Sequence, residues 1–184
     1  MHGLVNRAIQ CFYRDTYGPE AWAEIVRALD LPFTQFEPML HYETALTHKM
    51  TAEMARRQEK PVEAMLEDLG TYLVTHPNVE ALRRLLRFGG ETFVEFLHSL
   101  DDLPGRARLA VEDLDLPDME LREHGAQSFS LVCRSEGSGF GHVMLGILRT
   151  LADDYGALVF LEHRRGPADT EILDISVFKT DFAA

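Results

Sequence analysis

Hydrophobic residues recur at helical spacing throughout the first half of the chain. In residues 3–17, Val5, Ile9 and Phe12 fall on one face of a helix, because an α-helix turns once in 3.6 residues. Glycine and proline interrupt the pattern at intervals, which is typical of places where one helix ends and the next begins. The pattern predicts six helices, over residues 3–17, over the segment that follows Pro19, and over residues 42–57, 61–75, 78–88 and 91–106.

The second half of the chain alternates between apolar and polar residues, as half-buried strands do. Residues 119–124 and 128–133 flank a turn at Gly125-Ala126 and predict a β-hairpin. The patterns that follow predict a helix over 142–155, a strand over 158–163, a turn over 164–168 and a strand over 170–178. One antiparallel sheet of four strands, with a helix on a face, accommodates this order.

Together these patterns predict an α+β fold with an N-terminal helical part and a C-terminal four-stranded antiparallel sheet plus helix. A chain of 184 residues is about one domain by length and can bury a substantial core without disulfides or metals. We therefore expect a single domain over residues 1–184, with a mainly helical half, 1–110, packed on a sheet-containing half, 111–184.

The sixth predicted helix contains a proline inside its apolar stripe. Phe93, Phe96 and Leu100 share one helical face, and Pro104-Gly105 follows while that stripe is still running. Proline has no amide proton, and inside a helix it costs about 3 kcal/mol. The sequence therefore predicts that this helix kinks or ends at Pro104 on its buried side.

Composition and charge exclude several classes of partner. The net charge of −12 argues against binding to nucleic acid or to anionic membranes, since both require clustered lysine and arginine. No run of residues resembles a signal peptide or approaches the length of a membrane span. The two cysteines, Cys11 and Cys133, form no CxxC motif, which fits a reducing compartment. We expect a cytoplasmic protein.

No motif in the chain predicts an enzyme. The glycine-rich run 137–141 precedes a helix, but it lacks the Lys and Ser or Thr of a phosphate-binding loop. Eight histidines are scattered along the chain, and no cluster of Asp, Glu, His or Cys suggests a catalytic set. The alternative of an enzyme that uses the glycine-rich turn near Arg134 stays open to a test of nucleotide binding.

Residues 131–146 carry a familiar pattern, LVCRSEGSGFGHVMLG. Combined with Met1-His2-Gly3, Tyr17-Gly18, Phe96-Leu97, Leu100-Asp101 and Pro117, it resembles the H-NOX family of heme-based nitric oxide and oxygen sensor domains, which includes the sensor of soluble guanylate cyclase. The resemblance covers nearly the whole chain and is to the bacterial stand-alone members. It implies a heme cofactor and signalling to a cyclase, a diguanylate cyclase or a histidine kinase.

The resemblance also indicates degenerate heme motifs in this chain. Pro104 matches the position of the histidine that ligates the heme iron in the family. Cys133, Ser135 and Gly137 match the Tyr-x-Ser-x-Arg motif that holds the heme propionates, so only the serine is retained. Proline has no lone pair to give to iron, and glycine cannot offer the guanidinium that pairs with a carboxylate. The resemblance therefore implies a member that has lost the usual heme attachment.

Other matching positions keep the apolar character of a heme pocket. Pro117 matches the proline that the family presses against the macrocycle. Four apolar residues match the distal side, and none is the tyrosine that would favour oxygen, so a bound heme would favour nitric oxide. These are Val5, Ile9, Leu73 and Val143. Without heme such a cavity must be filled or collapse, and the candidates for filling it are Phe93, Phe96, Met119 and Met144.

Two functions follow from the resemblance. The first is a heme-independent regulatory domain that acts through a protein partner in trans, since no effector follows in the sequence before Ala184. The acidic chain would prefer a basic patch on that partner. The second is a sensor that holds heme or another apolar ligand by different contacts, with His98, His142 or Cys133 as the substitute iron ligand.

Overall fold

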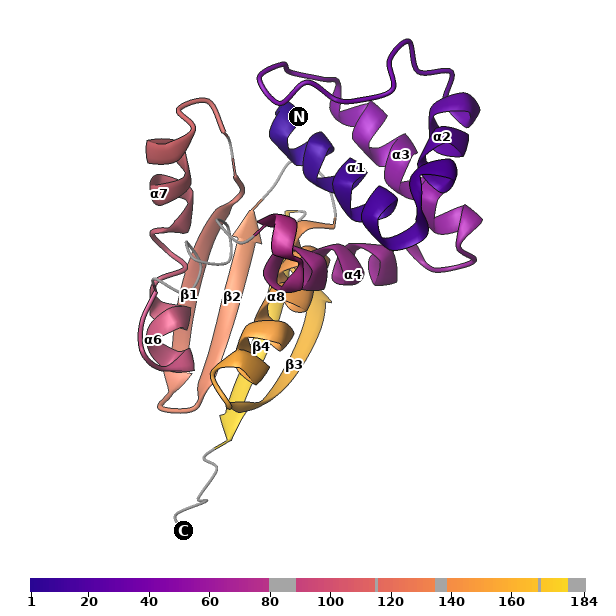
Figure 1. Cartoon of the computed structure of the whole chain (residues 1–184). Helices are drawn as coiled ribbons and strands as arrows, with labels where there is room; N and C mark the ends of the chain where they lie inside the picture. The colour runs from indigo at the N-terminus through magenta and orange to yellow at the C-terminus, as the bar shows by residue number, and fades with distance from the viewer. Residues whose placement is uncertain (80–88, 115, 135–138, 169, 179–184) are drawn as a thin grey trace. The chain divides into compact units, whose positions relative to one another are not determined.

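The computed structural model describes the chain apart from residues 80–88, 115, 135–138, 169 and 179–184 (Figure 1). The chain divides into two compact units, Met1–Leu69 and Gly70–Ala184, and each is described here by itself. The grouping of residues 1–184 into one domain, with its halves meeting at residue 110, stays a prediction.

Unit 1 is helical, as its sequence pattern predicts. Helix α1 begins after His2, whose Nδ1 accepts a hydrogen bond of 3.1 Å from the Leu4 amide. It ends at Gly18, which has a φ of 94° and leads directly into Pro19, the first residue of α2. The helices are α1 (Gly3–Tyr17), α2 (Pro19–Ala28), α3 (Thr44–Arg57) and the first two turns of α4 (Val62–Thr75).

The buried face of α1 is partly polar, which the apolar pattern does not predict. Gln10 is 1% exposed, and its Oε1 accepts a hydrogen bond of 2.9 Å from the Phe36 amide. Asn6 is also buried, and its Oδ1 accepts from Thr47 Oγ1 at 2.7 Å. Because buried polar groups are costly unless paired, these bonds fix the position of α1 against α3 and the 31–43 connection.

Unit 2 contains the predicted sheet. Strand β2 pairs with β1 on one side and with β4 on the other, and β3 pairs with β4, so that the order is β1-β2-β4-β3 and all pairs are antiparallel. The elements are β1 (Asp118–Gly125), β2 (Ser128–Arg134), α8 (Phe140–Asp154), β3 (Leu158–Arg165) and β4 (Glu171–Phe178). Helix α8 covers one face of the sheet (Figure 1). The α+β fold class is confirmed.

A continuous apolar core lies between the sheet, α8 and the helix at 93–98 in unit 2. Phe129 and Leu131 of β2 and Leu173 of β4 point into it, as the period of two along a strand requires. The four residues suggested as cavity fillers, Phe93, Phe96, Met119 and Met144, are all buried members of this core, with exposed fractions of 3%, 0%, 7% and 1%.

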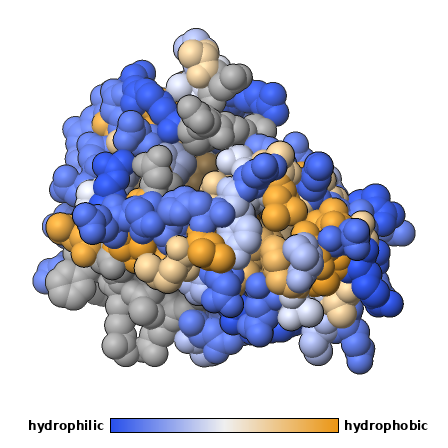
Figure 2. All heavy atoms as spheres, turned by 90° about the horizontal axis from the view of Figure 1, so that it is seen from above, coloured by the Kyte–Doolittle hydropathy of each residue, from blue (hydrophilic) through white to orange (hydrophobic). Residues whose placement is uncertain are grey.

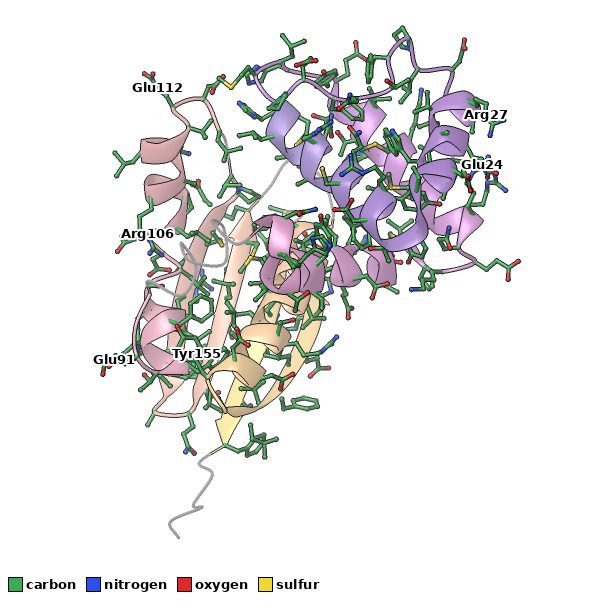
Figure 3. The ribbon with its side chains drawn as sticks, in the orientation of Figure 1. Glu24, Arg27, Glu91, Arg106, Glu112 and Tyr155 are labelled. Carbon is green, nitrogen blue, oxygen red and sulfur yellow. The ribbon has the colours of Figure 1, made fainter. Side chains whose placement is uncertain are left out.

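The prediction of one continuous sixth helix is wrong, because two short helices occupy this segment. Helix α6 (Phe93–His98) ends before Pro104 is reached, and a second helix, α7 (Leu103–Ala110), begins beside it. Pro104 lies in the first turn of α7, where an amide proton has no helical partner in any case. Arg106 Nη2 bridges the two helices by donating to the Ser99 carbonyl at 3.0 Å (Figure 3). The proline therefore starts a helix and does not interrupt one.

Two further boundaries differ from the sequence expectations. The fifth predicted helix, 78–88, lies mostly outside the described residues, and its start is a short 3₁₀ turn, Pro77–Val79. The turn expected from residue 164 starts later, because Arg164 and Arg165 still pair with Ile172 and Glu171 in the sheet.

The outer face of the sheet carries a polar network. Ser130 Oγ donates to Asp174 Oδ1 at 2.6 Å and lies 2.8 Å from His124 Nε2, and Arg164 Nε donates to Asp174 Oδ2 at 2.5 Å. The Arg164 guanidinium, together with the Ser130 hydroxyl, lowers the pKa of Asp174. These contacts join all four strands of the sheet on a face that α8 does not cover.

We expect Asp174→Asn to lower the free energy of unfolding by about 1 kcal/mol at pH 7, because a partly exposed carboxylate loses its ion pair and a charge-assisted hydrogen bond. The folded-state pKa is lowered, so this contribution is present above the unfolded-state pKa and is lost as pH falls through the folded-state value. Urea titrations at pH 7 and at acid pH check it. The exposed Asp118→Asn serves as control, and an equal loss at both pH values would contradict the prediction.

Hydrophilic side chains cover most of the face seen in Figure 2. Among the described residues, no helix is long and apolar enough to cross a bilayer.

Three exposed apolar side chains share the outer face of the sheet. Leu158 of β3 pairs with Phe178 of β4, and Phe160 lies two residues further along β3. They form a small apolar area at the β3 edge.

Candidate functional site

The positions matched to the heme motifs fall in different elements of unit 2. Pro104 is buried in the first turn of α7, and Cys133 is completely buried near the end of β2. Pro117 is half-buried, immediately before β1. Ser135 and Gly137 lie outside the described residues, so their predicted roles stay predictions.

The four positions matched to the distal side fall in both units. In unit 2, Leu73 of α4 and Val143 of α8 are half-buried and pack against the core. The two helices touch through their backbones there, because a Cβ on Gly70 would lie 2.0 Å from the Val143 carbonyl oxygen. In unit 1, Val5 is half-buried and Ile9 is 4% exposed, both on α1.

The buried Cys133 thiol is held in its neutral form. Burial raises its pKa to about 12, and the negative charge of Glu171, which lies opposite it in the β2–β4 pair, acts in the same direction. Iron and other metals bind the thiolate and not the thiol. The environment of Cys133 therefore weighs against its use as a substitute iron ligand.

We expect Cys133 to react slowly with thiol reagents. A rise in pKa from the ordinary 9.0 to about 12 lowers the thiolate fraction at pH 8 about a thousandfold. Iodoacetamide should therefore label the half-buried Cys11 first and leave Cys133 unlabelled in the folded protein, as read by peptide mass spectrometry. In denaturant both thiols should react, and rapid native labelling of Cys133 would contradict the assignment.

His98 lies on an exposed part of unit 2. It is the last residue of α6, its side chain is 47% exposed, and its Nε2 is 2.9 Å from Glu123 Oε1. Its ring meets Phe129 edge-on, with centroids 6.0 Å apart. A histidine engaged in this way with an exposed carboxylate is poorly placed to serve as an iron ligand inside an apolar pocket.

His142 lies in a cluster with two residues from other elements. Its ring packs at a tilt against that of His163 in β3, with centroids 4.0 Å apart, and His163 Nε2 is 3.1 Å from Glu171 Oε1 at the start of β4. Glu171 is 3% exposed, and its Oε2 accepts hydrogen bonds of 3.0 Å from the amides of Gly139 and Gly141. The sequence pattern does not predict this group, because its members are separated along the chain. The available signal is a glutamate at the start of a mostly apolar strand.

Ser130 resembles a hydrolase nucleophile only superficially. In a catalytic triad the histidine bridges the serine and the aspartate. Here Ser130 itself is the bridge, since it donates its proton to Asp174 and contacts His124 on its other side. The arrangement is not the serine–histidine–aspartate order of a catalytic triad, and its contacts join the strands of the sheet.

The order of helices, the β1-β2-β4-β3 sheet and the covering helix define the H-NOX class of sensor domain. The chain belongs to the haem-NO-binding family, whose model matches residues 2–163. The expected family is thereby confirmed. The degeneracy of its heme motifs remains an inference from matched positions.

Curated relatives are parts of much longer proteins. Soluble guanylate cyclase gcy-31 of Caenorhabditis elegans is 24% identical over 154 residues, which are 84% of this chain and 22% of the cyclase. Soluble guanylate cyclase 89Db of Drosophila melanogaster is 20% identical over 158 residues, 86% of this chain and 24% of the cyclase. The chain thus spans less than a quarter of these proteins.

Solved structures show the same fold at low identity. The Fe(II) unliganded H-NOX protein from K. algicida matches with a TM-score of 0.83 at 13% identity and covers 100% of each chain. An H-NOX protein from S. oneidensis in the Fe(II)NO ligation state matches with a TM-score of 0.80 at 15% identity, covering 97% of this chain and all of that one. The family binds heme, and its members signal to partner proteins.

Proposed function

We propose that this chain is an H-NOX regulatory domain that works without the family's histidine–iron bond and signals through contact with a protein partner. The observation that carries the proposal is Pro104, which is buried in the first turn of α7 at the position matched to the iron ligand. A proline side chain has no lone pair, and so it cannot coordinate iron.

The three suggested substitute ligands support the same conclusion. Heme iron in proteins is held by histidine, thiolate, methionine or tyrosine. Cys133 is a neutral thiol, His98 pairs with Glu123 on the surface, and His142 belongs to the cluster around Glu171. None of the three suggested substitutes is therefore arranged as an axial ligand.

The core of unit 2 also supports a domain that folds without a macrocycle. Phe93 and Phe96 of α6, Met119 of β1 and Met144 of α8 are buried together with the sheet residues. Protein interiors are close-packed, and a large empty cavity is destabilising. These four large side chains pack the apolar core of unit 2 with one another and with the sheet residues, so this packing does not depend on a bound ligand.

The proposed partner is a protein, as in the family. The net charge of −12 favours a partner with a basic surface, because complementary charge speeds association. The apolar area formed by Leu158, Phe160 and Phe178 provides exposed side chains of the kind that protein contacts bury. A cyclase, a diguanylate cyclase or a histidine kinase would be the corresponding effector, and cytoplasmic location is part of the same proposal.

Absorbance of the purified protein tests the proposal. The chain is expressed with an excess of heme precursor beside the H-NOX protein from S. oneidensis as a positive control. We expect an intense Soret band from the control and none from this chain, with heme content measured as the pyridine complex. A one-to-one heme stoichiometry in this chain would overturn the proposal.

The second candidate is a heme sensor that favours nitric oxide. It is favoured by the apolar residues Val5, Ile9, Leu73 and Val143 at the positions matched to the distal side, where no tyrosine could stabilise bound oxygen. The same spectra distinguish the two functions. If a Soret band appears, it should shift on addition of nitric oxide to the ferrous protein and stay unchanged in air.

A further inference from the structure

The cluster of His142, His163 and Glu171 has the composition of a metal site. One ligand atom from each residue lies within 4.8 Å of the others. The three residues come from the start of α8, the end of β3 and the start of β4, all within unit 2. In Figure 1 this is the end of the sheet opposite the C-terminus.

The distances suit a small tetrahedral ion. Zinc binds histidine nitrogen and carboxylate oxygen at about 2.0–2.2 Å, so two ligand atoms of one tetrahedral ion lie about 3.3 Å apart. His163 Nε2 and Glu171 Oε1 are already 3.1 Å apart. The His142 ring is tilted against that of His163, with centroids 4.0 Å apart, and one of its nitrogens lies within 4.8 Å of the ligand atoms of the other two residues.

Backbone hydrogen bonds fix the orientation of the Glu171 carboxylate. Oε2 accepts hydrogen bonds of 3.0 Å from the amides of Gly139 and Gly141, which orients the group and leaves Oε1 directed at the histidines. Metal ligands in proteins are commonly fixed in this way by hydrogen bonds to their other atoms. The side chains of Glu171 and His163 are 5% and 13% exposed, so the site is enclosed but reachable from solvent.

Gly141 is a second, independent sign of a built site. A Cβ at this position would lie 2.9 Å from His163 Nε2 and 2.9 Å from the Glu171 Cβ. Any side chain would therefore push against the ligand atom of His163. Glycine keeps the space at the centre of the cluster open.

We propose that His142, His163 and Glu171 bind one divalent ion of the zinc class, with a water molecule in the fourth position. Two histidines and one glutamate form a ligand set typical of zinc, and an open fourth position is typical of such three-ligand sites. To bind the ion, each histidine presents an unprotonated ring nitrogen and Glu171 its carboxylate oxygen, because metal ligands must be deprotonated. The ion ties the start of α8 to β3 and β4.

Zinc titration of the whole chain tests the proposal. Protein freed of metal with a chelator is titrated with Zn²⁺ by calorimetry and with Co²⁺ by visible absorbance. We expect one ion per chain and the d–d spectrum of tetrahedral Co²⁺. Binding below one ion per chain in the natural protein would overturn the site.

Variants locate the ion. His142→Ala, His163→Ala and Glu171→Gln should each weaken zinc binding by at least about tenfold, the lower bound found when a supporting contact of a metal site is lost. His98→Ala is the matched control, since it removes another histidine of unit 2 that lies beside a glutamate. Circular dichroism verifies folding of each variant. Equal affinity in the control and in a folded cluster variant would place the ion elsewhere and reject the proposal.

Discussion

We expect the Pro104→His variant to bind more heme than the natural chain. The substitution places an imidazole in the first turn of α7, at the position matched to the family's iron ligand, and a neutral imidazole gives its lone pair to iron. Below saturation, every 1.4 kcal/mol contributed by this bond raises occupancy about tenfold. We therefore expect at least about ten times more heme per chain, read from the Soret band and the pyridine complex.

The cost to folding should be small in this variant. Proline in the first turn stabilises a protein mainly through the unfolded chain, by less than about 1 kcal/mol, and histidine is tolerated there. Pro61→His, at an exposed position before α4, controls for heme picked up by a surface histidine. Equal heme content in the two variants, with both folded, would show that position 104 does not face a heme site.

The largest expected loss of stability is that of Phe96→Ala. Phe96 is completely buried, and its ring lies 5.9 Å from that of Phe93 and 6.0 Å from that of Tyr155. Figure 3 places Tyr155 beside α6, where its hydroxyl donates to the Gly90 carbonyl at 3.1 Å. Removing a buried phenyl ring costs about 3–5 kcal/mol in lost transfer energy and cavity formation.

Urea unfolding followed by circular dichroism measures this loss. The matched control is Phe160→Ala, which removes the same ring from a position that is 58% exposed and should change stability by less than about 0.5 kcal/mol. A loss below about 1 kcal/mol for Phe96→Ala would mean that the core of unit 2 collapses freely or is less well packed than described.

The spacing of apolar residues and the positions of glycine and proline in the sequence predict most of the fold. The alternation through Phe129, Leu131 and Cys133 identifies β2 because every second side chain of a strand points to the same face. Gly18-Pro19 marks the joint between α1 and α2 because glycine reaches a positive φ and proline starts a helix easily. The boundaries of these elements follow from the conformational preferences of residues that are close together in the sequence.

The sequence does not predict the break between α6 and α7. The apolar stripe continues through Leu100 and Leu103, both buried, and so the pattern reads as one helix. Tertiary packing holds the intervening turn, and Arg106 satisfies the Ser99 carbonyl there. Spacing along the chain cannot separate one bent apolar face from two short helices that share a core.

The candidate sites also differ in how far the sequence predicts them. Pro104 and Cys133 can be singled out from the sequence only by matching positions to a family, since neither residue type signals a heme pocket by itself. The cluster around Glu171 requires α8, β3 and β4 to meet, and pairing of β3 with β4 brings His163 and Glu171 together. A local pattern in the sequence does not predict long-range register of this kind.

The contact at Gly70 has a mechanical consequence. With the backbone of α4 resting on the Val143 carbonyl, no side-chain layer separates the two helices to absorb a displacement. A displacement of the first turn of α8 toward α4 would therefore have to move the α4 backbone with it at this point of unit 2.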